Sequence, residues 1–385
     1  MLENEIFLIS TKAGAGGHYF VLEDIKWLIK RGFIIHLVSE ARRPPLNEIK
    51  LHTFRKFGLP KSRYLKRLLN WIHEPRDILT TIYISRLASY IEETQKKFNF
   101  PFIHAHFALP EGTASVLASH KPVLVTVHGY DVQVHESVGY GIRLRKFGDE
   151  AVKWTLERAS LIMVANQYMR EVVKNIVDNQ KIEIVTNAVD VQKFRPNVSC
   201  NIELPQKYIF CLKQHTSVSG IDVLIKAFNK IKKIFPNLKL LIGGSGPKTK
   251  YYIKLANKLG INKSIRFLGY IEHDKLPCYY ARASMVVVPS LIEAFGLSAT
   301  EAMACGRPVV VSDVGGLREQ VIHGVNGLRF PPGDVNALAE AIETLLRDPD
   351  LAEKMGKIGR EIAIQNYSME KRIDRLIKIY RRFTS

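Results

Sequence analysis

The sequence predicts an α/β protein made of two doubly wound, Rossmann-like domains in tandem. Three observations support this prediction. The chain has 385 residues, more than one ordinary core organises. Short apolar runs alternate with amphipathic stretches in both halves. Between the halves, residues 191–207 contain two prolines and show little periodicity. We therefore expect one domain over residues 1–195 and a second over residues 203–367.

The first half opens on a strand. The apolar run "EIFLIS" leads into the Gly-rich turn "KAGAGGHYF", and "VLEDIKWLIKRG" then has helical periodicity up to Gly32. Further buried strands are predicted at "FIIHLVSE", "FIHAHF", "PVLVTVH", "LIMVAN" and "KIEIVTNAVD", with helices between them. Strands that alternate with helices predict a parallel sheet covered on both faces.

The same pattern restarts after residue 207. Strands are predicted at "YIFCLK", "LKLLIGG", "SIRFLGY", "SMVVVPS", "PVVVSD" and "GLRF". Helices are predicted at "GIDVLIKAFNKIKKI", at "YYIKLANKLG", after Phe295, and over most of the last 35 residues. Ligands bind at the carboxyl ends of the strands in such sheets, so we expect the functional residues there.

Composition narrows the class of protein. Hydrophobic residues make up 46% of the chain, enough for two cores, and the net charge of +19 favours nucleotides, nucleic acid or an anionic membrane surface as partners. No apolar run approaches the roughly 18 residues of a membrane span, and "MLENEIFLIS" lacks the basic flank of a signal peptide. The scattered cysteines, which lack metal-site spacing, fit a reducing compartment: Cys200, Cys211, Cys278 and Cys305. We expect a cytoplasmic protein.

The stretch "PSLIEAFGLSATEAMACGRPVV" places two carboxylates beyond a buried strand. Glu293 follows the strand directly, where a ligand would lie. Gly296 allows a tight turn with uncovered N–H groups, and Ser298 is predicted to start a helix whose N-terminus suits a phosphate. For Glu301 two interpretations stay open. It contacts a ligand, or it forms a capping box with Ser298.

This stretch and its continuation, "VVSDVGGLREQVIHGVNGLRFPPGD", resemble the donor-site signature of the retaining glycosyltransferases of family 4, which have the GT-B fold. The resemblance covers nearly the whole chain. It implies two Rossmann-like domains that face each other across a cleft. The first would bind the acceptor and the second a nucleoside-diphosphate sugar, and the last helix, about 368–385, would pack back on the first domain.

The resemblance also implies roles for single residues. Glu293 would contact the donor sugar hydroxyls and Glu301 the ribose hydroxyls, because a carboxylate accepts two hydroxyl donors at once. His128, in "VTVHGYDV", would lie near the reacting centre, so Glu293 and His128 are the expected catalytic residues. The other residues expected at the donor are Gly16, Gly17, Lys213, Gly244, Phe295, Gly296 and Leu297, the last three through their N–H groups.

"HAHFALPEG" resembles the exopolysaccharide-type subset of the family; we assign its His104 and His106 no catalytic role and favour packing for both. One stretch departs from the family. In "FCLKQHTSVSG", Lys213 stands where the family has arginine and Ser219 where it has lysine. Arginine-to-lysine keeps the charge but loses the bidentate fork. The lost second cation predicts a weaker or specialised donor site, or substitution by His215 or Lys248.

The segment "RKFGLPKSRYLKRLLNWI" has six cations and no acid between Arg55 and Arg67, interleaved with aromatic residues and leucines. Such a segment suits an anionic membrane surface. Two alternatives stay open: a solvated basic face over ordinary core residues, or a nucleic-acid site, which no recognisable module supports. We therefore expect no nucleic-acid partner and a peripheral position on the membrane.

The resulting hypothesis is a cytoplasmic glycosyltransferase of polysaccharide biosynthesis. It would transfer a sugar from a nucleoside-diphosphate sugar, UDP-sugar before GDP- or ADP-sugar, to a hydroxyl of a glycan or lipid-linked acceptor. Retention at the anomeric carbon, and catalysis without a metal or other cofactor, follow from the resemblance. The alternatives are a sugar-nucleotide epimerase, a pyridoxal-dependent phosphorylase, and a degenerate subunit that binds a partner or nucleotide without catalysis.

Overall fold

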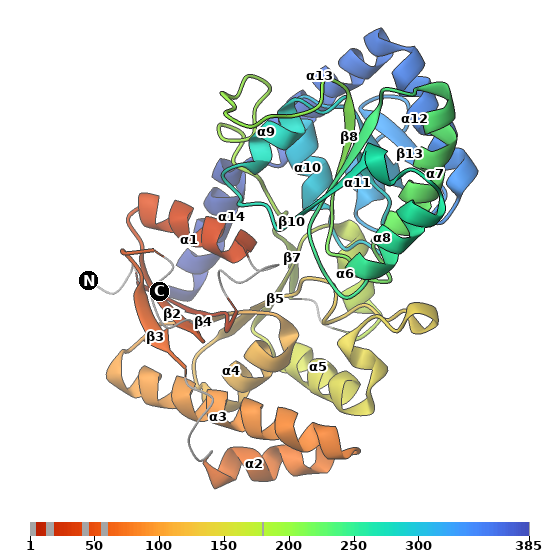
Figure 1. Cartoon of the computed structure of the whole chain (residues 1–385). Helices are drawn as coiled ribbons and strands as arrows, with labels where there is room; N and C mark the ends of the chain where they lie inside the picture. Colours follow the sequence, from red (N-terminus) through yellow and green to blue (C-terminus); the bar gives the residue numbers. More distant parts are fainter. Residues whose placement is uncertain (1–4, 13–18, 41–45, 55–60, 179–180, 385) are drawn as a thin grey trace. The chain divides into compact units, whose positions relative to one another are not determined.

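The computed structural model (Figure 1) describes residues 5–12, 19–40, 46–54, 61–178 and 181–384. The chain forms two compact units. Unit 1 comprises Met1–Thr186 together with Arg372–Ser385, and unit 2 comprises Asn187–Lys371. The acceptor and donor roles that we assign to the two halves stay predictions.

Unit 1 contains a parallel sheet with the strand order β3-β2-β1-β4-β5-β6-β7. Its strands are β1 (Glu5–Ile9), β2 (Ile34–Ser39), β3 (Lys50–Thr53), β4 (Ile103–His106), β5 (Val123–Thr126), β6 (Leu161–Val164) and β7 (Ile182–Ile184). The order reverses between β1 and β4, the point at which ligands bind in doubly wound sheets. The sequence did not predict β3, because this short edge strand has no apolar run.

The helices of unit 1 are α1 (Tyr19–Lys30), α2 (Ser62–Leu68), α3 (Pro75–Lys97), α4 (Thr113–Ala118), α5 (Lys146–Arg158), α6 (Gln167–Lys174) and α14 (Met369–Thr384), whose first residues still belong to unit 2. Their ends follow local rules. A capping box of Glu74 and Asp77 starts α3, with Pro75 at its first position. The Asn166 side chain accepts the N–H of Met169 and so caps α6.

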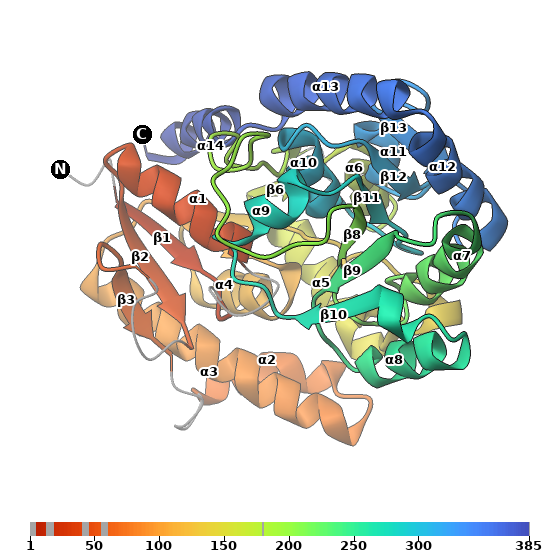
Figure 2. The ribbon, with the colours of Figure 1, turned by 45° about the horizontal axis from the view of Figure 1, so that its top comes forward.

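Unit 2 repeats the architecture with the order β10-β9-β8-β11-β12-β13, again parallel throughout. Figure 2 shows β10, β9 and β8 side by side. The strands are β8 (Tyr208–Leu212), β9 (Lys239–Gly243), β10 (Ile265–Gly269), β11 (Met285–Val288), β12 (Val309–Ser312) and β13 (Gly327–Phe330). The switch point lies between β8 and β11.

The helices of unit 2 are α7 (Ile221–Ile234), α8 (Thr249–Lys258), α9 (Leu276–Ala281), α10 (Leu297–Ala304), α11 (Leu317–Gln320), α12 (Val335–Arg347) and α13 (Pro349–Asn366). The helical segment predicted at the C-terminus is therefore two helices, because Tyr367 and Ser368 separate α13 from α14. Among the described residues, no helix combines the length and the apolar character needed to cross a membrane.

The central strands explain the unbroken apolar runs of the sequence. Along β11, Val287 packs into one core cluster, whereas Val286 and Val288 pack into another. Successive side chains of a strand point to opposite faces, so a strand covered on both faces needs apolar residues at every position. β12 repeats this arrangement, with Val310 in one cluster and Val309 and Val311 in the other.

Helix α14 belongs to unit 1 through buried contacts. Arg372 forms a bidentate pair with Asp24 of α1, with N–O distances of 2.6 and 2.7 Å, and also donates to the carbonyls of Val185 and Thr186. Both side chains of the pair are 3% exposed. Tyr380 hydrogen-bonds to Nδ1 of His104 in β4 at 2.8 Å. The buried ion pair ties the C-terminal helix to α1, and the Tyr380–His104 hydrogen bond ties it to β4.

One feature of unit 2 corrects the cysteine interpretation. Cys200 and Cys278 form a disulfide, while Cys211 and Cys305 are free and buried. The sequence indicated free thiols, because 78 residues separate the paired cysteines and nothing local brings them together. The bridge joins the segment before β8 to α9.

Candidate active site

The carboxyl ends of β8 and β11 bring two predicted donor residues together. Lys213 follows β8 and Glu293 lies five residues after β11, and these strands flank the switch point of unit 2. Nζ of Lys213 lies 2.6 Å from Oε2 of Glu293, with both side chains about one-sixth exposed. The Ser290 hydroxyl donates to the same oxygen at 3.0 Å. These contacts fix the direction of both charged side chains at the strand ends.

Two glycines allow backbone segments near this pair to pack closely against each other. Gly244 has φ of 103°, and a Cβ there would lie 1.9 Å from the carbonyl oxygen of Lys213. Gly220 has φ of 65°, and its Cβ would lie 1.8 Å from the carbonyl oxygen of Pro289. Any side chain at either position would push the backbone away from the Lys213–Glu293 pair. The predicted donor residue Gly244 thus acts by shaping the loop.

The turn before α10 presents backbone donors. Gly296 is the N-cap, with φ of 102°, and α10 begins at Leu297. In the part of the chain that the structure describes, the N–H groups of Phe295, Gly296 and Leu297 make no hydrogen bond. Nε2 of Gln320 donates to the Phe295 carbonyl at 2.7 Å and holds the turn. Unsatisfied N–H groups at a helix start attract anions, so this turn suits a phosphate.

The capping-box interpretation of Glu301 is wrong. The helix starts one residue before Ser298, and its N-cap has no side-chain hydrogen bond. The Glu301 carboxylate instead accepts from the Tyr280 hydroxyl at 2.7 Å, and Nε2 of His273 lies 3.8 Å from its other oxygen. Tyr280 is a positioning residue that the sequence did not reveal, because the six-residue helix α9 that carries it was not predicted.

The departures from the family have a structural account. Ser219 is buried, and its hydroxyl donates to the Thr216 carbonyl at 2.7 Å and hydrogen-bonds to Tyr252 at 3.0 Å. His215 does not replace the missing cation, because it is fully buried and desolvation lowers the pKa of its imidazole. Lys248 is exposed, and its N–H donates to the His215 carbonyl at 2.9 Å, so this second candidate remains available.

His128 lies in unit 1, two residues after β5, within a cage of rings. Its Nε2 hydrogen-bonds to Nδ1 of His106 at 3.1 Å, and the rings of Phe20 and Phe107 each lie 4.5 Å from its own. Phe107 has φ of 78°, a left-handed conformation that is unfavourable for a residue other than glycine. His106 is therefore more than packing, since it orients the ring of His128. Among the described residues, the His104 side chain hydrogen-bonds to Thr126 and Tyr380.

Asp131 holds the backbone around His128. Its carboxylate accepts the N–H groups of His128 and Gly129, both at 3.0 Å, and that of Ala108 at 2.9 Å. Burial raises the pKa of Asp131, although these donors oppose the shift. The sequence carried a signal for this residue. An aspartate three positions after the histidine, in "HGYD", is typical of a turn stabilised by its own side chain.

The switch point of unit 1 also joins two strand ends. Thr11 follows β1 and Glu111 follows β4, and the Thr11 hydroxyl donates to the Glu111 carboxylate at 2.6 Å. The Thr11 N–H donates to the same oxygen at 3.3 Å. The predicted donor residues Gly16 and Gly17 lie outside the described residues.

Glu111 gives a prediction about pH. Burial raises the pKa of this carboxyl to about 7, from 4.5. Between these values the folded chain holds a proton that the unfolded chain releases, so the free energy of unfolding falls as pH rises from 4.5 to 7. We expect Glu111→Gln, which keeps the acceptor oxygen, to raise the Tm at pH 8 and to lose this advantage as pH falls to 4.5. Thermal denaturation of both proteins at pH 4.5, 6, 7 and 8 measures this difference in Tm.

The exposed Glu340 of α12 provides the control for this prediction. Glu340→Gln should shift the Tm equally at every pH. If the difference between Glu111→Gln and wild type were also independent of pH, Glu111 would not be the group that titrates.

Aspartates and histidines do not assemble into a metal site in the described ranges. No group of three or more His, Cys, Asp or Glu side chains there could hold a metal ion. The Asp-x-Asp triplet of the chain, Asp348-Pro349-Asp350, starts α13. Asp348 accepts the N–H of Leu351 at 2.9 Å and so caps that helix.

Two family models match this chain, one over the half that contains the first sheet and one over the half that contains the second. Residues 15–193 match the family model "Glycosyltransferase Family 4", and residues 197–362 match "Glycosyl transferases group 1". An uncharacterized glycosyltransferase of Methanocaldococcus jannaschii is 31% identical over 59% of this chain and 61% of its own length. N-acetyl-alpha-D-glucosaminyl L-malate synthase of Bacillus anthracis is 27% identical over 92% of this chain and 91% of its own.

Solved structures share the fold along the whole chain. Sucrose-phosphate synthase from Thermosynechococcus elongatus has a TM-score of 0.82 at 23% identity, covering 98% of both chains. HepE of Anabaena, solved in complex with UDP-glucose, has a TM-score of 0.76 at 19% identity, covering 97% of this chain and 98% of its own. The predicted fold class is confirmed by these neighbours and by the two parallel sheets.

Proposed function

The chain belongs to glycosyltransferase family 4 and is a glycosyltransferase that uses nucleotide sugars. From this premise we propose that it transfers the sugar with retention at the anomeric carbon and without a metal ion. We further propose that the acceptor is a glycan or a lipid-linked sugar. One observation carries the proposal. The Lys213–Glu293 pair and the free N–H groups before α10 meet at the switch point of unit 2, as a diphosphate and a sugar require.

Each end of the donor has matching chemistry in this arrangement. The N–H groups of residues 295–297 and the N-terminus of α10 would bind the diphosphate, together with Nζ of Lys213. Glu293, held by Ser290, would accept sugar hydroxyls, and Glu301, held by Tyr280, would accept ribose hydroxyls. The negative charge of the leaving diphosphate would then be stabilised by backbone dipoles and by Lys213.

In the proposed reaction, the bond from the anomeric carbon to the diphosphate oxygen breaks and its electron pair leaves with the diphosphate. The acceptor hydroxyl bonds to the anomeric carbon on the same face, and its proton moves to the leaving phosphate oxygen. His128, whose Nε2 is held by His106 and whose backbone is held by Asp131, would support the positive charge that develops at the sugar. This scheme needs no nucleophile from the enzyme.

Nucleotide binding tests the donor assignment. We expect UDP to raise the Tm most among UDP, GDP, ADP and CDP, because the structural neighbour HepE was solved with UDP-glucose. A ligand at about 100 times its Kd stabilises by about 2.7 kcal/mol, or about 5–10 °C for a unit of this size. A larger shift with GDP, ADP or CDP would reassign the base. The absence of any shift at millimolar concentrations would contradict a working donor site.

The stereochemistry and the metal are tested with the donor found in that panel. We expect NMR of the product to show the same anomeric configuration as the donor, and turnover to be unchanged in excess EDTA. An inverted product would overturn retention. Loss of turnover in EDTA, restored by a divalent cation, would overturn metal independence.

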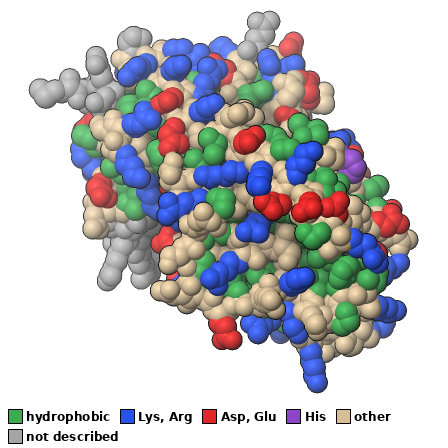
Figure 3. Space-filling view, turned by 90° about the horizontal axis from the view of Figure 1, so that it is seen from above, with side chains coloured by type: hydrophobic (Ala, Val, Ile, Leu, Met, Phe, Trp, Pro, Cys, Tyr) green, Lys and Arg blue, Asp and Glu red, His purple; other side chains and the backbone are tan. Residues whose placement is uncertain are grey.

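We also propose that an exposed face around α2 contacts an anionic membrane that carries the acceptor. This basic face consists of Lys66 and Arg67, which have no ion pair among the described residues, and the exposed apolar residues Leu69, Ile78 and Leu79. Other cations nearby are neutralised: Glu92 of α3 pairs with Lys61 and Arg63. Residues 55–60 lie outside the described part. On the side seen in Figure 3, Lys and Arg side chains are spread among acidic ones.

Vesicle sedimentation tests the basic face. We expect Lys66→Glu with Arg67→Glu to reduce binding to vesicles with 30% anionic lipid by about thirtyfold or more, since each cation contributes about 1 kcal/mol near such a surface and reversal adds repulsion. The control reverses Lys254 and Lys258 of α8, in the other unit. Equal loss in both variants would show that net charge alone drives binding.

A further inference from the structure

A pocket of about 670 Å³ lies on unit 2, lined by two parts of the segment before β8 and by residues that follow α9 and α10. Gln206 precedes β8, Arg282 precedes β11 and Arg307 precedes β12. Because all these strands are parallel, their starts share one edge of the sheet, and Lys213 and Glu293 lie at the opposite edge. The pocket is therefore separate from the donor site.

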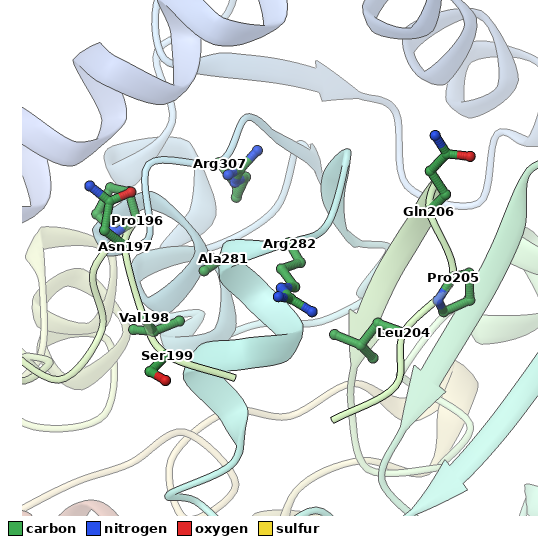
Figure 4. A pocket seen from close by; sticks show the side chains of 10 residues that line it. All are labelled: Pro196, Asn197, Val198, Ser199, Leu204, Pro205, Gln206, Ala281, Arg282 and Arg307. Atoms are coloured by element: carbon green, nitrogen blue, oxygen red, sulfur yellow. The ribbon is translucent and has the colours of Figure 1, made fainter. Parts of the chain in front are cut away.

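Two arginines face this pocket without an acidic partner. Figure 4 shows Arg282 between Ser199 on one side and Leu204 on the other, with Arg307 nearby. Neither guanidinium group forms an ion pair or a hydrogen bond with a described residue, and Nε of Arg307 is buried without an acceptor. Burial raises the pKa of the Tyr208 hydroxyl, and the charges of Arg307 and Arg282 oppose that shift.

Two other inward-facing arginines of this chain find acceptors, whereas Nε of Arg145 and Nε of Arg170 are, like that of Arg307, buried without one in the described structure. Arg360 donates to the carbonyls of Val191, Phe194 and Ala304, and Arg372 pairs with Asp24. The acid that acts on Arg307 through space, Glu353, is itself paired with Lys357 at 2.6 Å. A buried donor without a partner is costly, so the unmet Nε–H of Arg307, in a pocket that it shares with the exposed and unpaired Arg282, points to an external anion.

We propose that this pocket binds a sugar phosphate, with the phosphate held between Arg282 and Arg307. A phosphate monoester carries between one and a half and two negative charges at neutral pH, about what two guanidinium forks match, whereas a carboxylate carries one. The volume exceeds what a bare phosphate fills and lies within the range of organic ligand sites. Asn197, Ser199 and Gln206 provide amides and a hydroxyl for the sugar body.

The walls of the pocket are tied together before any ligand arrives. Cys200, directly after the lining residue Ser199, forms the disulfide with Cys278 of α9, the helix that ends at the pocket. The Tyr208 hydroxyl donates to the carbonyl of Tyr279 at 2.8 Å and adds a second link. Fixed walls reduce the entropy lost on binding.

The test is a ³¹P NMR titration of the full chain with glucose 6-phosphate. We expect saturable binding that Arg282→Gln and Arg307→Gln each weaken by about tenfold or more, as lost bonds to a charged group predict. Arg266→Gln is the matched control. Arg266 is an exposed arginine of β10 in the same unit, without an ion pair and outside the pocket. It should leave the Kd within twofold, and so should Lys213→Ala at the donor site.

Arg282 is exposed, so its variant should fold normally and keep the test valid even if Arg307→Gln unfolds. Unchanged affinity in Arg282→Gln would overturn the site. Loss of binding in Lys213→Ala, with none in Arg282→Gln, would assign the phosphate to the donor site instead. Equal binding of inorganic phosphate would overturn the sugar phosphate assignment, and so would the absence of binding at 10 mM.

Discussion

The Glu293→Ala variant is expected to retain less than about 1% of the wild-type kcat/KM for sugar transfer. A carboxylate that accepts two sugar hydroxyls makes two charge-assisted hydrogen bonds, each contributing about 1.5–3 kcal/mol, so their loss exceeds two orders of magnitude. The substitution also removes the partner that directs Nζ of Lys213, 2.6 Å away. Initial rates with the donor identified by nucleotide binding provide the measurement.

The fold of the Glu293→Ala variant should be intact. Glu293 lies in a loop, and its carboxylate contacts only the side chains of Lys213 and Ser290 in the described structure. We expect the Tm to fall by a few degrees at most. Glu340→Ala, on the exposed side of α12, should keep full activity. Wild-type activity in Glu293→Ala would remove Glu293 from the donor site and with it the central contact of the proposed function.

The second large effect concerns stability. Replacement of Asp24 by leucine is expected to lower the free energy of unfolding of unit 1 by about 3–5 kcal/mol, because it leaves the guanidinium of Arg372 buried without its carboxylate. The corresponding fall in Tm is about 6–20 °C. Denaturation followed by tryptophan fluorescence reports on this unit, because Trp27, Trp71 and Trp154 all lie in it.

Two further variants separate burial from charge. Arg31, directly after α1, and Asp374 of α14 form an exposed ion pair at 2.8 Å. Asp374→Ala should therefore lower the free energy of unfolding by less than about 1 kcal/mol. The double variant Asp24→Leu with Arg372→Met should recover most of the stability, since it leaves no buried charge. A double variant no more stable than Asp24→Leu alone would show that the two residues do not act as a pair.

Much of the fold could be predicted from local patterns. Strands β8, β9, β11 and β12 each contain a run of at least three apolar residues, because they are covered on both faces, and each was located within about two residues. The missed elements include the short β3, α9 and α11, which have no apolar run or long helical period, and also α12, whose buried residues do recur at helical spacing. The sequence signature identified Glu293 and Glu301 as the expected donor-binding residues. It did not identify the side chains that hold them in place, such as Tyr280.

By itself, the sequence determined the two α/β halves, the strands after which the charged residues come, and the family. Tertiary structure decided which strand ends are neighbours. Lys213 and Glu293 are 80 residues apart and meet because β8 and β11 pair, and Glu301 meets Tyr280 rather than capping its own helix. Asp24 finds Arg372 across 348 residues. Period and propensity act within a few residues, whereas strand order and burial depend on the whole chain, so such partners follow only from the folded structure.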